Sequence, residues 1–126
     1  MAKILLVDDD LTLVSRHRAM LKGRGHSVIV VTSPAQAMAA VRAQVPDLVV
    51  LEALFEGKLS GLDLARELAT SHPDLPLIML TCADELISKA KIATQDHDGW
   101  LPVARYLEKP VMEDVLADEV EHLLAD

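Results

Sequence analysis

The sequence predicts a doubly wound α/β fold, in which a five-stranded parallel sheet is flanked by five helices. Short apolar runs alternate with longer segments of helical periodicity along the whole chain. Three of the runs are apolar at nearly every position, which is typical of parallel strands that are covered on both faces. An alternation of this length implies right-handed crossovers and a doubly wound sheet.

Five apolar runs rich in Val, Ile or Leu are the expected strands. The first, third and fourth are the most continuously apolar, so we expect them to lie inside the sheet. The expected strands span Ile4 to Val7, Ser27 to Val31, Asp47 to Leu51, Leu77 to Leu80 and Arg105 to Leu107.

Five further segments have the apolar spacing of helices. Ser33 is an N-cap followed by Pro34 at the first helical position. Gly23 and Gly25 suit the end of the first helix. The expected helices span about Leu11 to Lys22, Pro34 to Ala43, Leu62 to Ser71, Glu85 to Thr94 and Val111 to Leu124.

Length and composition indicate one globular domain over residues 1–126. Half of the residues are apolar and a quarter are charged, and no repeat or linker divides the chain. Cys82 is the only cysteine, so no internal disulfide is expected. The N-terminal apolar run is too short for a signal peptide, and no stretch approaches membrane-spanning length. We therefore expect a cytoplasmic protein that does not enter a membrane.

The charge balance argues against nucleic-acid binding. Twelve basic and twenty acidic residues give a net charge of -8, which repels a phosphate backbone. Phe55, Trp100 and Tyr106 are the only aromatic residues that could stack on bases.

The chemistry-bearing residues follow the expected strands. Asp8, Asp9 and Asp10 follow the first strand, and Glu52 follows the third. Thr81 and Lys109 follow the fourth and fifth strands. In a doubly wound sheet, ligands bind at the carboxyl ends of the strands. Carboxylates crowded there repel one another unless a divalent cation or an ammonium lies among them, so Lys109 and Mg²⁺ are the expected counter-charges.

Four motifs at these strand ends carry a family resemblance. KILLVDDD, PDLVVLE, PLIMLT and YLEKP occur in this order. Together they resemble the CheY-like receiver domains of bacterial two-component response regulators, and the likeness covers essentially the whole chain. The resemblance implies a flavodoxin-like receiver topology and a place in a phosphorelay.

The resemblance also implies roles for individual residues. Asp8 and Asp9 match the acidic pair that holds Mg²⁺, with Asp9 the more direct ligand. Thr81 matches the hydroxyl that bonds a phosphoryl oxygen, and Lys109 matches the ammonium that pairs with the same group. Tyr106 matches the aromatic switch position that turns inward as the hydroxyl moves.

Glu52 stands where the family has its phosphorylated aspartate, and it would complete the metal-binding set. Its extra methylene moves the carboxylate out of line with a donor phosphate, so we expect little or no phosphotransfer. One carboxylate carries one negative charge where an aspartyl phosphate carries nearly two, so mimicry of phosphorylation would be partial. An ion pair between Glu52 and Lys109 is favoured over full mimicry. A surface acid without any role is the plain alternative.

The expected function is that of an interaction module and not of an enzyme. Its implied partners are a sensor histidine kinase, a phosphotransfer protein or another receiver, including a second copy of the chain. The family binds partners through its fourth helix, fifth strand and fifth helix. The segment from Glu52 to Gly61 is longer than the corresponding segment of the family and lacks the family's proline. The span from Thr81 to Lys109 is also longer than in the family, so we expect a remodelled switching surface.

The sequence is also compatible with other functions. The chain could accept phosphate at a non-standard residue, or it could be the receiver part of a longer regulator whose output domain is absent. A flavin-mononucleotide binder needs a hydroxyl- and glycine-rich loop after the first strand, where this chain has three aspartates. A dehalogenase-type phosphatase is a weak alternative, because Asp8 and Asp10 have the required spacing but the cap insertion is missing.

Overall fold

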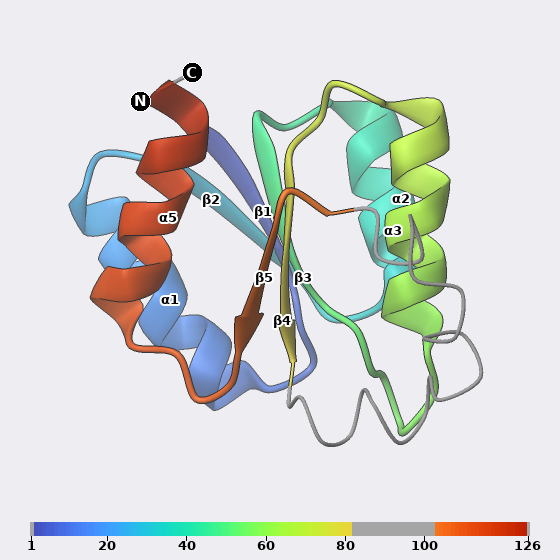
Figure 1. Cartoon of the computed structure of the whole chain (residues 1–126), viewed down its shortest axis with the longest axis horizontal. Helices are drawn as coiled ribbons and strands as arrows, with labels where there is room; N and C mark the ends of the chain where they lie inside the picture. Colours follow the sequence, from blue (N-terminus) through green and yellow to red (C-terminus); the bar gives the residue numbers. More distant parts are fainter. Residues whose placement is uncertain (1, 82–102, 126) are drawn as a thin grey trace.

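The computed structural model describes residues 2–81 and 103–125, in which five strands form one sheet (Figure 1). The strand order is β2-β1-β3-β4-β5, and each pair of neighbours is parallel. The predicted doubly wound parallel sheet is thus confirmed. The strands are β1 (Lys3–Val7), β2 (Ser27–Val31), β3 (Leu48–Glu52), β4 (Leu77–Thr81) and β5 (Arg105–Glu108).

The helices form two layers, with α1 and α5 on one face of the sheet and α2 and α3 on the other (Figure 1). The predicted helix from Glu85 to Thr94 lies outside the described residues. Helix α3 begins at Ser60, earlier than predicted. Its start was hard to predict because the N-cap residue, Leu59, forms no side-chain cap hydrogen bond. The helices are α1 (Leu11–Gly23), α2 (Pro34–Ala43), α3 (Ser60–Ser71) and α5 (Glu113–Ala125).

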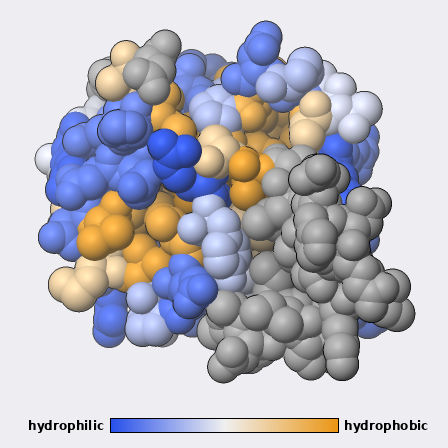
Figure 2. All heavy atoms as spheres, viewed as in Figure 1, coloured by the Kyte–Doolittle hydropathy of each residue, from blue (hydrophilic) through white to orange (hydrophobic). Residues whose placement is uncertain are grey.

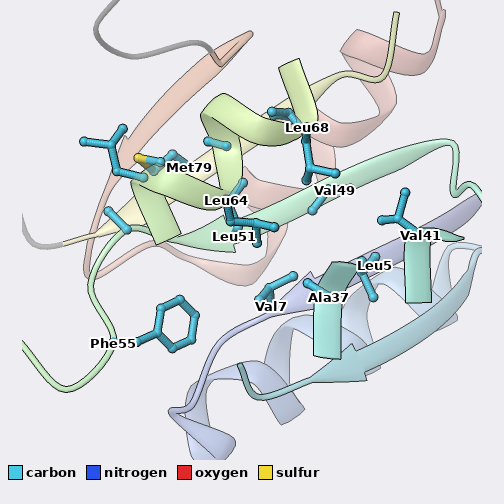
Figure 3. Close-up of a cluster of buried hydrophobic side chains, with 14 of the residues drawn as sticks. Leu5, Val7, Ala37, Val41, Val49, Leu51, Phe55, Leu64, Leu68 and Met79 are labelled. Carbon is cyan, nitrogen blue, oxygen red and sulfur yellow. The ribbon is translucent and has the colours of Figure 1, made fainter. Parts of the chain in front are cut away.

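Two apolar clusters hold the layers together. Side chains alternate along β1, so that Leu5 and Val7 face α2 and α3 while Ile4 and Leu6 face α1 and α5. Figure 3 shows the first cluster, in which the labelled side chains of the central strands meet those of α2 and α3. Every residue of β3 and β4 is buried, as expected for the central strands of a covered parallel sheet.

Helices α1 and α2, which follow the carboxyl ends of β1 and β2, have N-termini that are capped by side chains. Asp10 is the N-cap of α1, and its Oδ1 accepts a hydrogen bond from the backbone N–H of Leu13 at 3.1 Å. Ser33 caps α2 by accepting from the N–H of Gln36 at 3.2 Å, as the sequence predicts. No helix in the described part of the chain is long and apolar enough to cross a membrane.

The start of α3 lies directly against the end of β3. The backbone N–H of Gly61 donates to the carbonyl oxygen of Ala53 at 3.0 Å. A Cβ atom at Gly61 would collide with the carbonyl oxygen of Glu52. The close approach therefore depends on glycine, and it holds the Glu52 backbone in place.

Candidate functional site

The carboxyl ends of β1, β3 and β5 bring one lysine and two carboxylates together. The Nζ of Lys109 lies 2.6 Å from Oε2 of Glu52 and 3.0 Å from Oδ2 of Asp8. The three side chains are 15%, 7% and 8% exposed, respectively. The predicted ion pair between Glu52 and Lys109 is therefore present, and Asp8 shares the same ammonium.

The backbone around Lys109 explains its placement. Its N–H donates to the carbonyl oxygen of Thr81 at 2.9 Å, which continues the pairing of β5 with β4. The peptide bond between Lys109 and Pro110 is cis. On the other side of the site, the N–H of Asp8 donates to the carbonyl oxygen of Val31 at 3.1 Å and extends the pairing of β1 with β2. Sheet hydrogen bonds thus orient both partners of the ion pair.

Each carboxylate also accepts a backbone hydrogen bond through its second oxygen. Oδ1 of Asp8 accepts from the N–H of Asp10 at 2.9 Å. Oε1 of Glu52 accepts from the N–H of Leu54 at 3.1 Å. All four carboxylate oxygens therefore have a donor, which is what largely buried charges require.

The ionisation of Lys109 reflects these contacts. Burial lowers the pKa of Lys109, but the hydrogen bonds and charge attraction from Glu52 and Asp8 raise it by more. The pKa therefore lies above its ordinary value of 10.5, and the lysine carries its positive charge across the physiological pH range.

Thr81 and Tyr106 lie on the neighbouring strands. Thr81 is fully buried, and its Oγ1 has no hydrogen-bond partner in the described part of the chain. An unpaired buried hydroxyl costs about 1–3 kcal/mol, so a polar group that the described residues leave unsatisfied lies on the strand that pairs with Lys109. Tyr106 is partly buried and packs against the cluster that lies between the sheet and α2 and α3. The switch roles of both residues stay predictions.

Of the three residues predicted to hold Mg²⁺, Asp8 and Glu52 come together in this structure and Asp9 does not join them. Receiver domains generally bind Mg²⁺ at the phosphorylation site, where carboxylate oxygens are its preferred ligands. Asp8 and Glu52 instead share the ammonium of Lys109, while Asp9 is exposed. Among residues 2–81 and 103–125, no three acidic, histidine or cysteine side chains form a group that could hold a metal ion. The side chains as they lie fit a lysine counter-charge and not a divalent cation.

The segment between β3 and α3 folds into a tight turn. Phe55 and Lys58 exchange two backbone hydrogen bonds, of 2.9 and 3.0 Å. Glu56 and Gly57 between them have positive φ angles of 53° and 74°. Leu54 and Phe55 are buried, and Figure 3 places Phe55 beside the apolar cluster. The turn thereby fixes the Leu54 N–H that bonds Glu52.

His17 is a buried residue near the site that received no role from the sequence. It is 2% exposed and has a backbone hydrogen bond with Val111, while its Nε2 has no partner in the described residues. Burial lowers the pKa of His17, against the raising effects of the Val111 hydrogen bond and of Glu113 and Asp8. Its spacing from Val14 and Leu21 on the buried side of α1 is the signal that could have identified it as a core residue.

The comparisons with known proteins agree with the geometry. The family model described as "Response regulator receiver domain" matches residues 4–121. The response regulator MprA of Mycolicibacterium vanbaalenii is 31% identical over 107 residues, which are 85% of this chain and 46% of MprA. The chain thus spans just under half the length of these relatives.

Solved receiver structures superpose on nearly the whole chain. The receiver domain of NtrX from Brucella abortus is 29% identical, with a TM-score of 0.79 and coverage of 97% of this chain and 98% of that one. A response regulator receiver domain protein from Clostridium thermocellum is 25% identical, with a TM-score of 0.79 and coverage of 99% and 95%. The chain therefore belongs to the family of response regulator receiver domains.

Proposed function

We propose that this receiver domain of a two-component response regulator works without phosphorylation at the usual position and acts by binding other proteins. One observation carries the proposal. The Glu52 carboxylate, at the position of the phosphoacceptor, is bonded to Lys109 through one oxygen and to the Leu54 N–H through the other. The pocket is therefore closed by its own side chains.

Phosphotransfer to a carboxylate needs an oxygen that is free to attack phosphorus in line with the leaving group. Neither oxygen of Glu52 is free, and its 2.6 Å contact with Lys109 is the shortest in the site. The lysine that would stabilise the charge of an incoming phosphoryl group is already neutralised by Glu52 and Asp8. We accordingly assign no enzymatic activity to the domain.

Partial mimicry of the phosphorylated state is the second candidate. The negatively charged Glu52 carboxylate contacts the Lys109 ammonium, which is the contact that the family resemblance implies for an aspartyl phosphate. The hydroxyl of Thr81, however, has no partner in the described residues, whereas a phosphoryl group would supply an acceptor. The contact with Lys109 is thus imitated, and the contact with Thr81 is not.

The surface of α5 supports a role in protein binding. Figure 2 shows apolar residues interrupting the hydrophilic surface over α5 and the segment before it. Met112 is 65% exposed and Val115 is 45% exposed in this part of the chain. Methionine is enriched in protein interfaces, and these two side chains are three positions apart, so they support a contact with another protein. We propose a sensor histidine kinase, a phosphotransfer protein, another receiver or a second copy as the partner class.

The test is phosphorylation by a small acyl-phosphate donor in the presence of Mg²⁺, followed by intact-mass measurement. We expect no adduct on the wild type and a labile phosphoryl adduct on Glu52→Asp, because the shorter side chain withdraws from Lys109. Glu67→Asp makes the same change at an exposed position of α3 and should remain unmodified.

Two other results would change this interpretation, and the first would overturn the proposal. An adduct on the wild type that disappears in Glu52→Gln would show that Glu52 is itself an acceptor, and the proposal would fail. Absence of an adduct from all variants would leave the proposal standing but would show that Glu52 is not the sole reason.

A further inference from the structure

Strand β2 forms an open edge of the sheet, since β1 is its only neighbour among the described strands. The N–H of Ser27 donates to Ala2 at 2.8 Å, and the carbonyl of Val31 accepts from Asp8 at 3.1 Å. Backbone groups of successive strand residues point to opposite sides, so Ser27, Ile29 and Val31 turn toward β1. The N–H and C=O groups of the two residues between them, at positions 28 and 30, therefore point away from the sheet.

The side chains of β2 do nothing to protect this edge. Exposed edges are usually protected by charged residues, proline or a bulge, but the strand reads SVIVV. Ile29 at its centre is 56% exposed. The opposite edge strand, β5, has exposed Arg105 and Glu108 at its two ends. β2 is thus the edge at which main-chain pairing is easiest.

A groove lies on each face of this edge, and the one on the α2 side is mainly apolar. On the α2 side, a groove of about 200 Å³ is lined by Leu5, Ile29, Ala40 and Pro46, among others. An added strand would direct its side chains alternately to the two faces of the sheet. The α1-side groove, of about 310 Å³, is of mixed character, since Ser15 and Arg18 line it together with Leu11, Val14, Val28 and Val30.

The length of the open edge is limited at its carboxyl end. The N–H of Thr32 would be the next outward-facing donor, and it already bonds to Oε1 of Gln36 at 2.8 Å. The backbone groups available for pairing are therefore those of Val28 and Val30. An added strand would be short and would depend on its side chains for affinity and specificity.

The charges beside the grooves indicate which kind of segment would bind. Lys3 lines the α2-side groove and Arg18 lines the α1-side groove, and both are exposed. Neither side chain forms an ion pair with the described residues, and no acidic residue lines either groove. A second copy would present the same cations at its own edge and no carboxylate from its groove linings. Carboxylates on the incoming segment would complement the two cations.

We propose that β2 binds an extended segment of a partner protein as a sixth strand, with apolar side chains at alternate positions and carboxylates at its ends. This is binding by strand addition, in which main-chain hydrogen bonds supply affinity and the two grooves select side chains. The surface lies at the sheet edge opposite β5 and does not depend on the state of the Glu52 pocket.

The test uses a synthetic peptide in which valine and threonine alternate between terminal glutamates, together with a version that has terminal lysines. Amide hydrogen exchange is read by NMR at each residue of β2. At nearly full occupancy by the glutamate peptide, exchange at Val28 and Val30 should slow about tenfold, because only unbound molecules expose these amides. The amides of Ile29 and Val31 already bond to β1 and should change little. The lysine peptide should bind about tenfold more weakly.

Two substitutions keep the test specific. Ile29→Lys places a charge on the edge and should abolish the protection, while Val45→Lys makes a similar change at a valine that is 52% exposed and lines neither groove. The proposal is overturned if saturating glutamate peptide leaves Val28 and Val30 unprotected. It is also overturned if the lysine peptide binds equally well, or if protection grows with protein concentration alone, which would identify a second copy as the occupant.

Discussion

The carboxyl end of the sheet and its β2 edge differ in whether their polar groups are satisfied within the domain. At the carboxyl end, Lys109 pairs with Asp8 and Glu52, and every oxygen of the two carboxylates has a donor. Along β2, the backbone groups of Val28 and Val30 face away from the sheet. One region satisfies its charges internally, whereas the other leaves hydrogen-bonding groups and apolar surface open to a partner.

The two regions differ in the free energy that binding a ligand would require. A ligand entering the closed pocket must first displace contacts that already satisfy buried charges, and that displacement is costly. A strand added at β2 replaces only water, and it buries Ile29 in the process. In this chain we therefore expect binding at the surface to matter more than chemistry in the pocket.

The largest expected effect on stability comes from disturbing the close contact between the start of α3 and the end of β3. Gly61→Ala should lower the free energy of unfolding by about 3 kcal/mol or more, because the new Cβ collides with the backbone of Glu52. Urea denaturation measures the change. Gly23→Ala is the control, since nothing lies within 4 Å of a Cβ there, and it should be neutral or slightly stabilising. Equal stability of the two variants would contradict the close approach of α3 to β3.

Removal of the ammonium should have the next largest effect. Lys109→Met leaves two neighbouring carboxylates without their counter-charge and should cost about 2 kcal/mol at neutral pH, less than for a fully buried pair because the lysine is partly exposed. Glu52→Gln added to this variant should restore part of the loss. Lys58→Met, at an exposed lysine, should change stability by less than about 0.5 kcal/mol. Additive effects of the Lys109 and Glu52 substitutions would argue against their coupling.

The same ion pair predicts a loss of stability in alkali. The pKa of Lys109 is raised in the folded state, so its contribution is complete below the ordinary value of 10.5 and is lost as the pH rises through the folded-state value. The difference in stability between wild type and Lys109→Met should therefore shrink above pH 10.5, as measured by urea denaturation at several pH values. A constant difference across this range would exclude the charge as the cause.

His17 should make a smaller contribution to stability, and this contribution should decrease at acidic pH. Its pKa is lowered in the folded state, so its contribution to stability is complete above the ordinary value of 6.5 and falls as the pH drops toward the folded-state value. His17→Leu should stay within about 1 kcal/mol of the wild type at pH 7.5. It should lose less stability than the wild type on acidification. His122→Gln, which replaces an exposed histidine of α5, is the control substitution.

The smallest effect on stability is expected at the open edge. Ile29, Leu5 and Val49 form one row across three strands, but Ile29 is 56% exposed and Val49 is fully buried. Ile29→Lys should change the free energy of unfolding by less than about 0.5 kcal/mol, whereas Val49→Lys should prevent folding. Circular dichroism and urea denaturation distinguish the two. A large loss of stability in Ile29→Lys would mean that the edge is packed and not open.

The sequence predicted much of the fold because its signals are local. All five strands were found from short apolar runs, and Ser33 with Pro34 correctly placed the start of α2. The start of α3 was missed because Leu59 provides no side-chain cap. His17 received no role because its burial follows from the packing of α1 against the segment around Val111 and not from a motif.

The candidate site divides in the same way between sequence and tertiary structure. By itself, the sequence determined that Asp8, Glu52 and Lys109 lie at the ends of parallel strands, and it predicted that Glu52 occupies the phosphoacceptor position. Only the tertiary structure decided that the ammonium bridges both carboxylates and that β2 lies at an edge with a groove on each face. The physical reason is the separation along the chain of the residues that interact. Apolar periodicity acts between near neighbours, whereas Lys109 and Asp8 are 101 positions apart, and their pairing depends on how the whole sheet is assembled.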